Sequence, residues 1–262
     1  MELENKVAIV TGGARGIGRG IAVALARAGV DVVIGDLLGV PELARDAHET
    51  AAAVEALGRR ARVVRCDVTL PADSEALAAA ALQEFGRLDI VCCNAGVLSG
   101  FSVLELSLAE WERVLRVNLT GTFLTCKAAL PYLIARGGGS IVNTASSTGL
   151  KGAAQLAHYS ASKFGVVGFT QALAAEVAGQ GVRVNCVCPS SVRTQLSLDE
   201  MRRRTGVAEE KADRAWTRAA AERLPLRKSV EPEEIGDAVV YLCRADSVTG
   251  TALEVTGGEQ LL

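Results

Sequence analysis

Residues 7–18 read Val-Ala-Ile-Val-Thr-Gly-Gly-Ala-Arg-Gly-Ile-Gly, and this stretch decides the fold of the chain. The four apolar residues at its start predict a buried strand, and a helical pattern follows over residues 17–28. Between them lie Gly12, Gly16 and Gly18. Glycine permits a tight turn and lets the backbone approach a pyrophosphate, which the N–H groups at a helix start attract. The stretch therefore predicts the strand, loop and helix of a dinucleotide-binding unit.

Apolar, strand-like runs alternate with helical patterns along the rest of the chain. The strand-like runs after the first lie at residues 32–34, 62–64, 89–93, 140–144, 182–187 and 252–255, and the helical patterns at residues 42–57, 71–85, 108–136 and 157–179. Because these runs carry little polar alternation, they indicate a parallel sheet buried on both faces. We therefore predict a single α/β domain over residues 1–262: a Rossmann-type, doubly wound parallel sheet of about seven strands with helices on both faces.

One segment interrupts this alternation. Residues 195–228 are rich in Arg, Glu and Ala and show little strand signal. They follow the sixth strand, and the carboxyl ends of the strands lie on the ligand side of such a sheet. We interpret the segment as a mobile helical lid over a substrate; the alternative is a pair of solvated surface helices.

Composition narrows the possible function. The chain has 262 residues, 49% hydrophobic and 22% charged, with a net charge of -2, so it lacks the basic excess of a nucleic-acid binder. We find no apolar run long enough to span a membrane and no signal peptide, and we expect a cytoplasmic protein. The seven cysteines and two histidines form no metal-binding motif, so we expect no metal and interpret the cysteines as small buried residues.

An acidic residue ends the second strand-like run. Asp36 stands eighteen residues after Gly18, near the position from which a carboxylate can bind the ribose hydroxyls of a dinucleotide. The same charge would repel a 2′-phosphate, which favours NAD over NADP. Arg15 acts in the opposite direction, since a guanidinium there can reach a phosphate. The alternative reading of Asp36 is a solvated carboxylate at a strand end.

A second signal lies near the middle of the chain, where Tyr159 and Lys163 are four residues apart and Ser146 precedes them by thirteen. In a helix, residues four apart lie on one face. A unit charge at ~4 Å is worth ~4 kcal/mol at an effective dielectric of ~20, or roughly three pKa units. A lysine can therefore turn a phenol into an acid/base that works near neutral pH. Taken alone, such a pair more often means a half-buried aromatic ring and a solvated amine.

Together these residues resemble the short-chain dehydrogenase/reductase family over nearly the whole chain. Residues 11–18 are similar to its cofactor loop, residues 94–96 (Asn-Ala-Gly) to its adenine-side signature, and Asp67 to the residue that meets the adenine amine. The resemblance implies cofactor contacts at Gly12, Arg15, Gly16, Ile17, Gly18, Asp36, Asp67, Val68, Asn94, Ala95, Gly96, Tyr159, Lys163, Pro189, Val192 and Thr194.

The resemblance also implies a catalytic tetrad of Asn118, Ser146, Tyr159 and Lys163. By this implication Ser146 hydrogen-bonds the substrate oxygen and Tyr159 exchanges the hydroxyl proton. Lys163 lowers the pKa of the phenol and holds the nicotinamide ribose, while Asn118 anchors a water that connects the lysine to solvent. Ser147 is the neighbouring candidate, but the spacing to Tyr159 and to the following glycine selects Ser146.

The chain departs from the family pattern after the sixth strand, where Ser190 replaces the usual glycine after Pro189. If that position needs a conformation that only glycine adopts easily, the loop must shift. We expect the substrate to be lined by mainly small or apolar residues, which favours a neutral secondary alcohol. The candidates are Ser99, Phe101, Ala153, Ala154, Leu156, His158 and Ser190, with His158 more simply read as structural.

The sequence therefore predicts an NAD(H)-dependent oxidoreductase that transfers hydride between the nicotinamide and a secondary alcohol or ketone. The resemblance implies a homotetramer, with interfaces on the helices over residues 108–136 and 157–179. Two alternatives stay open. One is an acyl-carrier-protein-linked 3-oxoacyl reductase that uses NADP(H), and the other is a dinucleotide-binding sensor without catalysis.

Overall fold

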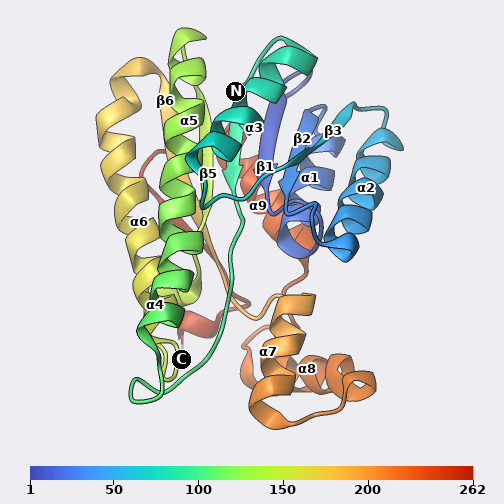
Figure 1. Ribbon diagram of the computed structural model, residues 1–262, viewed down its shortest axis with the longest axis vertical. Coiled ribbons are helices and arrows are strands. Elements are labelled where there is room, and N and C mark those ends of the chain that lie inside the picture. The colour runs from blue at the N-terminus through green and yellow to red at the C-terminus, as the bar shows by residue number, and fades with distance from the viewer. Residues whose placement is uncertain (262) are drawn as a thin grey trace.

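A sheet of seven parallel strands forms the centre of the protein (Figure 1). The computed structural model describes residues 1–261, so Leu262, the last residue of the predicted domain, lies outside the described residues. The strands are β1 Val7–Thr11, β2 Asp31–Asp36, β3 Ala61–Arg65, β4 Ile90–Cys93, β5 Gly139–Thr144, β6 Val182–Pro189 and β7 Ala252–Val255. Their order across the sheet is β3-β2-β1-β4-β5-β6-β7, and every pair of neighbours is parallel. The predicted doubly wound α/β sheet is confirmed.

Helices cover both faces of the sheet. They are α1 Gly16–Arg27, α2 Pro41–Glu55, α3 Pro71–Phe85, α4 Leu108–Leu115, α5 Gly121–Ala135, α6 Ala157–Val177, α7 Gln195–Thr205, α8 Glu209–Arg223 and α9 Pro232–Arg244. In β1, Ala8 and Val10 join the apolar core under α1, α2 and α9, whereas Val7 and Ile9 join the core under α3, α5 and α6. Successive side chains of a strand point to opposite faces, so an uninterrupted apolar run is what a sheet covered on both sides requires.

The strand order reverses direction between β1 and β4. The chain runs outward from β1 through β2 to β3, and then returns to place β4 on the other side of β1. At such a switch point the loops after the two strands diverge and leave a crevice at the carboxyl ends. The fold therefore brings the glycine loop after β1 next to the segment after β4.

The long helix expected over residues 108–136 is interrupted. A π-helical turn, Arg116–Thr120, separates α4 from α5 and contains Asn118. The side-chain amide of Asn118 bonds both the N–H and the carbonyl of Val97, at 2.8 and 3.0 Å, and this pair of bonds holds the turn against the segment after β4. The extra residue in one turn is the kind of irregularity that functional sites retain.

Helix α9 was not predicted from the sequence. It packs against α1, where a Cβ on Gly20 would meet the carbonyl of Pro232 and a Cβ on Gly236 the carbonyl of Gly20. The signals were present: a proline at the first helical position and Ile235, Val239 and Leu242 at a helical spacing, all fully buried.

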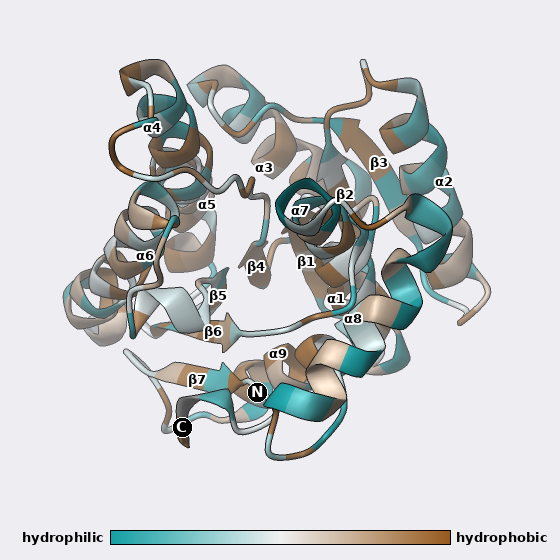
Figure 2. Ribbon diagram, turned by 90° about the horizontal axis from the view of Figure 1, so that it is seen from below, coloured by the Kyte–Doolittle hydropathy of each residue, from teal (hydrophilic) through white to brown (hydrophobic). Residues whose placement is uncertain are grey.

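The predicted lid segment contains α7 and α8, which stand away from the sheet on the side where the chain leaves β6 (Figure 1). In α7 no residue is buried, and in α8 only Ala212 and Ala220 are. In Figure 2, α7 is mainly hydrophilic, and hydrophilic residues alternate with more apolar ones along α8. The movement of this segment as a lid stays a prediction.

Candidate active site

The glycine loop is packed too closely for side chains. Gly12 has a φ of 62°, and a Cβ on Gly18 would lie 2.0 Å from the carbonyl oxygen of Gly12. Helix α1 begins at Gly16, and Gly16 and Ile17 line a large cavity beside the loop. The first N–H groups of a helix have no partner within it and carry its positive dipole end. The loop thus presents an anion-binding backbone to the cavity.

Asn94 fastens this loop to the neighbouring strands. Its Nδ2 donates to the carbonyls of Thr11 and Gly12, both at 3.1 Å, and its Oδ1 accepts from the hydroxyl of Thr144. The same side chain lies at the cavity wall with Ala95 and Gly96. The Asn-Ala-Gly segment predicted to border the cofactor therefore also sets the shape of the glycine loop.

Asp36 lies at the end of β2, beside the glycine loop. One carboxylate oxygen accepts from the N–H of Ala14 at 2.9 Å and the other from the N–H of Leu37 at 2.8 Å. A carboxylate has about four acceptor positions, so two stay available to hydroxyl donors. The side chain is 9% exposed and lines the cavity. Asp36 is therefore a structural tie with acceptor positions left at the cavity wall.

One cavity of about 1490 Å³ joins the predicted cofactor and substrate regions. It is larger than the ~300–1,000 Å³ of an ordinary small-molecule pocket, and has room for a dinucleotide together with a substrate. Among the catalytic and cofactor-binding residues predicted from the sequence, only Gly18 and Asn118 do not line it. Both lie directly behind the wall. The start of α1, Asp36 and the half-buried Asp67 together fit the phosphates, ribose and base of a dinucleotide.

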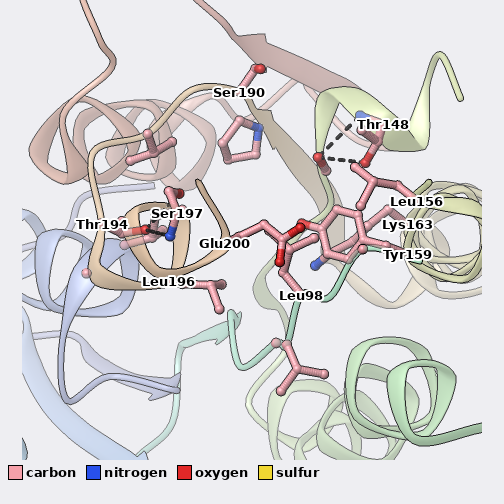
Figure 3. Close-up of a pocket in the computed structure, with 18 of the residues that line it drawn as sticks. Leu98, Thr148, Leu156, Tyr159, Lys163, Ser190, Thr194, Leu196, Ser197 and Glu200 are labelled. Atoms are coloured by element: carbon pink, nitrogen blue, oxygen red, sulfur yellow. Dashed lines mark hydrogen bonds between the residues drawn. The ribbon is translucent and has the colours of Figure 1, made fainter. Parts of the chain in front are cut away.

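Tyr159 and Lys163 project from the first turns of α6 into this cavity (Figure 3). The ammonium of Lys163 lies 5.7 Å from the centre of the Tyr159 ring and donates to the carbonyl of Thr144 at 2.7 Å. Ser146 follows β5, is 8% exposed, and accepts from the N–H and hydroxyl of Thr148 at 3.2 and 3.0 Å. The three side chains that the sequence singled out thus meet in one space.

Burial is the main cause of the pKa shifts of Tyr159 and Lys163. It raises the pKa of the Tyr159 phenol, which a hydrogen bond with Ser146 opposes, and it lowers the pKa of Lys163 to about 8. A lysine that is 4% exposed loses hydration, which destabilises its charged form. Both shifts disfavour the charged form, so the two pKa values move apart, and Lys163 is not among the causes that lower the pKa of Tyr159.

Asn118 is fully buried behind Lys163. A Cβ on Gly96 would lie 3.3 Å from Asn118 Oδ1 and 3.6 Å from Lys163 Nζ, so both polar atoms face the same glycine. Asn118 Nδ2 also donates to the hydroxyl of Ser162 at 3.1 Å. The asparagine therefore holds the segment after β4 at a fixed distance from the lysine.

The loop after β6 shows whether position 190 needs a backbone conformation that only glycine adopts easily. The left-handed conformation falls on the following residue, Ser191, with a φ of 52°, and not on Ser190. The N–H of Ser190 donates to the carbonyl of Val255 on β7, and the carbonyl of Ser191 accepts from Val230. Serine is therefore tolerated at position 190 without the expected backbone cost.

Three residues predicted to line the substrate do not reach the cavity: Ser99, Ala154 and His158. His158 is fully buried, and its Nε2 lies 3.0 Å from the hydroxyl of Ser99, which donates to Glu110 at 2.5 Å. Burial lowers the pKa of His158 and keeps the ring neutral. The structural interpretation of His158 agrees with this position. Phe101, Ala153, Leu156 and Ser190 do line the cavity.

Sequence reasoning did not find the charged side chains that line the substrate end of the cavity. They include Glu200, Arg203, Arg223 and Glu259. Glu200 pairs with Arg203 at 2.7 Å, and Arg203 lies over the ring of Phe101 at 5.3 Å. No motif marks these positions, because each side chain reaches the cavity from a helix or turn outside the motifs found in the sequence.

The fold and this arrangement agree with known proteins. The family model for short chain dehydrogenases matches residues 6–204, and the chain therefore belongs to this family of oxidoreductases. A (-)-trans-carveol dehydrogenase from Rhodococcus erythropolis is 39% identical over 99% of each chain. A D-threitol dehydrogenase from Mycolicibacterium smegmatis is 39% identical and covers 98% of this chain and 93% of its own.

Solved structures give the same result. The carveol dehydrogenase from Mycobacterium avium, solved in complex with NAD, has a TM-score of 0.92 at 32% identity and covers 100% of this chain and 99% of its own. The family predicted from the sequence is confirmed, and the relatives described above are dehydrogenases. Among residues 1–261, no helix is long and apolar enough to cross a membrane.

Proposed function

We propose that this chain is an NAD(H)-dependent dehydrogenase that interconverts a secondary alcohol and its ketone, with Tyr159 as the general acid/base. The observation that carries the proposal is the shared cavity. Tyr159, Lys163 and Ser146 line the same space as the glycine loop and Asp36. A protein that only binds a dinucleotide has no need of a phenol, an ammonium and a serine hydroxyl at its substrate end.

NAD is preferred over NADP because of Asp36. Its carboxylate faces the cavity beside the glycine loop and repels a 2′-phosphate there. Arg15, the residue that offered the opposite charge, also lines the cavity. The dinucleotide in the related carveol dehydrogenase structure is NAD, which supports the same choice.

The chain's own residues orient the alcohol and move its proton. NAD, when bound, supplies the hydride acceptor. The hydroxyl of Ser146 hydrogen-bonds the alcohol oxygen, and Tyr159 Oη takes the hydroxyl proton. The ammonium of Lys163, fixed by the carbonyl of Thr144, stabilises the phenolate that results. Asn118 keeps the segment after β4 against the lysine, and ketone reduction uses the same contacts in reverse.

The substrate class rests on the cavity and on the relatives. Leu98, Phe101, Leu156 and Leu196 give the substrate end an apolar lining, and two of the arginines there, Arg203 and Arg223, are paired with carboxylates. The names of two relatives give carveol and threitol, both neutral alcohols. A neutral secondary alcohol is therefore proposed, with residues 195–228 acting as its lid.

The protein is further proposed to be a cytoplasmic homotetramer. Phe123 and Tyr132 on α5 and Phe164 on α6 are 42%, 38% and 47% exposed, on the helices expected to form the interfaces. All seven cysteines are free and buried, which suits a reducing compartment. Sedimentation of the purified protein tests the oligomeric state.

The test of the proposed function is an absorbance screen of NADH formation over secondary alcohols, steroids and sugars. Tyr159→Phe is expected to lower kcat by ~10²–10⁴-fold and to leave NADH binding, measured by calorimetry, unchanged. Tyr241→Phe, an exposed tyrosine on α9, is the matched control and should behave as the wild type. Full activity of Tyr159→Phe would refute the assigned base, and a strong preference for NADPH would revive the acyl-carrier reductase.

A further inference from the structure

A charged cluster lines the cavity beside the loop after β6. It contains Glu259, Arg223, Ser190 and Ser191, which come from three separate segments: a short turn after β7 (Glu259–Leu261), the end of α8 and the loop after β6. All four residues line the same cavity as Tyr159. We call them the distal cluster.

The members of the distal cluster bond one another. Arg223 Nη1 lies 2.5 Å from Glu259 Oε1, the hydroxyl of Ser190 donates to the second oxygen of Glu259, and Arg223 Nη2 donates to the hydroxyl of Ser191. Glu259 is 22% exposed and Arg223 is 56% exposed. These bonds use two of the five N–H donors of the guanidinium, so donors and acceptors stay available to a ligand.

Folding stability does not account for the cluster. A half-exposed ion pair contributes about 1 kcal/mol at most. The cluster also lies close to the reacting groups. The N–H of Ser146 donates to the thiol of Cys188, and Ser190 follows Cys188 by two residues, a distance of ~7 Å along a strand. The distal cluster is therefore close enough to contact the part of a substrate that extends a few bonds beyond the reacting carbon.

The chemistry of the cluster selects one kind of group. A guanidinium only donates and a carboxylate only accepts, and together they have no net charge. A substrate carboxylate would meet the like charge of Glu259, and an ammonium that of Arg223. A hydroxyl accepts from Arg223 and donates to Glu259 at once. Trp216 adds another donor: its Nε1 is buried at the cavity wall and has no hydrogen-bond partner among the described residues.

We propose that the distal cluster binds a second hydroxyl, so that the preferred substrate is a neutral diol or polyol and not a simple alcohol. The inference rests on the proposed alcohol dehydrogenase function, whose substrate class it narrows. Glu259 and Arg223 are then specificity-determining residues, supported by Ser190 at the position where the family has glycine. Without the second hydroxyl, the cluster stays bonded to itself and contributes nothing to substrate binding.

The experiment compares cyclohexanol with 1,2-, 1,3- and 1,4-cyclohexanediol in NAD-coupled assays. Hydrogen bonds to charged groups are worth ~1.5–3 kcal/mol, so at least one diol should exceed cyclohexanol in kcat/KM by ~10–100-fold. That preference should fall about tenfold or more in Glu259→Ala and in Arg223→Met. The ratio of diol to cyclohexanol is the measured quantity, so the statistical advantage of two reactive hydroxyls cancels between variants.

Matched controls come from the same helix. Arg218 and Glu222 form an ion pair at 2.8 Å on α8, are 80% and 64% exposed, and lie outside the cavity. Arg218→Met and Glu222→Ala should keep the wild-type ratio. Equal kcat/KM for all diols and cyclohexanol in the wild type, or a preference that survives both cluster variants, would overturn the inference.

A binding measurement separates this inference from the proposed function. Calorimetry on the NAD-loaded Tyr159→Phe protein should show tighter binding of a diol than of cyclohexanol, and the difference should disappear when Glu259→Ala is added. If no alcohol is oxidised but this pattern holds, the proposed function fails and the diol site stands. If alcohols are oxidised but the two ligands bind equally, the diol site is refuted.

Discussion

The glycine loop after β1 and helices α7 and α8 after β6, the proposed lid, border the same cavity but are built in opposite ways. Every residue of β1 and β2 is buried, and the loop between β1 and α1 is held by backbone contacts that leave no room for a Cβ on Gly18. In α7 no residue is buried, and its charged side chains pair with one another at the surface. The cofactor end is fixed by packing, and the substrate end by polar side chains.

The two ends of the cavity therefore differ in how precisely they position a ligand and in how well they tolerate substitution. Close packing fixes the position of a ligand to within fractions of an ångström, which a hydride acceptor and a proton acceptor need. Exposed ion pairs contribute little to stability and tolerate replacement. Substitutions at the two ends of the cavity should therefore have very different consequences.

The largest effect is expected at the packed end. In Gly18→Ala the new Cβ would lie 2.0 Å from the carbonyl oxygen of Gly12 and 2.7 Å from Asn94 Nδ2, so the loop must move. Overpacking of this kind costs ~1–3 kcal/mol or more. We expect NADH affinity to fall at least ~100-fold, a change of about 2.7 kcal/mol, in a titration followed by NADH fluorescence.

Gly179→Ala is the control for this change. A Cβ on Gly179, after the end of α6, would meet nothing within 4 Å. It should leave both NADH affinity and the melting temperature near the wild-type values. Normal NADH binding by Gly18→Ala would show that the loop adapts, and would remove the contrast with the lid.

Lys163 tests what the buried site costs in stability. Below about pH 8 the lysine is charged in both the folded and the unfolded chain, so folding carries the full cost of burying a charged ammonium. Between about 8 and 10.5 the folded protein has released the proton and the unfolded chain has not. Stability from this group therefore rises with pH across that window, by about 3 kcal/mol at ~1.36 kcal/mol per pKa unit.

Lys163→Met removes this contribution. The free energy of unfolding of the variant relative to the wild type should therefore decrease by about 3 kcal/mol as the pH rises through that window, because only the wild type gains. Urea denaturation of both proteins at several pH values measures the difference. Parallel pH profiles would contradict the assignment of a buried, charged lysine to this end of the cavity.

Asp36→Asn should have a smaller effect, confined to cofactor choice. The amide keeps one oxygen, for the N–H of Ala14, but loses the acceptor for the N–H of Leu37 and removes the charge that is proposed to repel a 2′-phosphate. Partial exposure to the cavity reduces this repulsion, so we expect the ratio of kcat/KM for NAD to that for NADP to fall roughly tenfold, or ~1.4 kcal/mol. An unchanged ratio would limit Asp36 to its structural role beside the loop.

The same contrast explains what the sequence revealed. The strand, glycine loop and helix at residues 7–28, and the helical spacing of Tyr159 and Lys163, depend on neighbours close in the chain, so their patterns are visible. The contact of Ser190 with Glu259 joins residues 69 positions apart, and no local pattern announces it. Helix α9 was missed although its apolar spacing was present, because no motif drew attention to that segment.

The smallest predicted effect is at the lid. Arg203 on α7 pairs with Glu200 and lies over the ring of Phe101, which joins the lid to the segment after β4. An exposed cation–π contact is worth ~0.5–1 kcal/mol, so Arg203→Met should raise KM for the alcohol about two- to fivefold and leave kcat unchanged. Cleavage within residues 195–228 by a protease specific for glutamate should become faster.

Arg218→Met, which removes an arginine of the same segment away from the cavity, should alter neither measurement. If Arg203→Met matches that control, the proposed lid is held by something other than this contact. Polar side chains would then matter less at the substrate end than its contrast with the packed cofactor end implies.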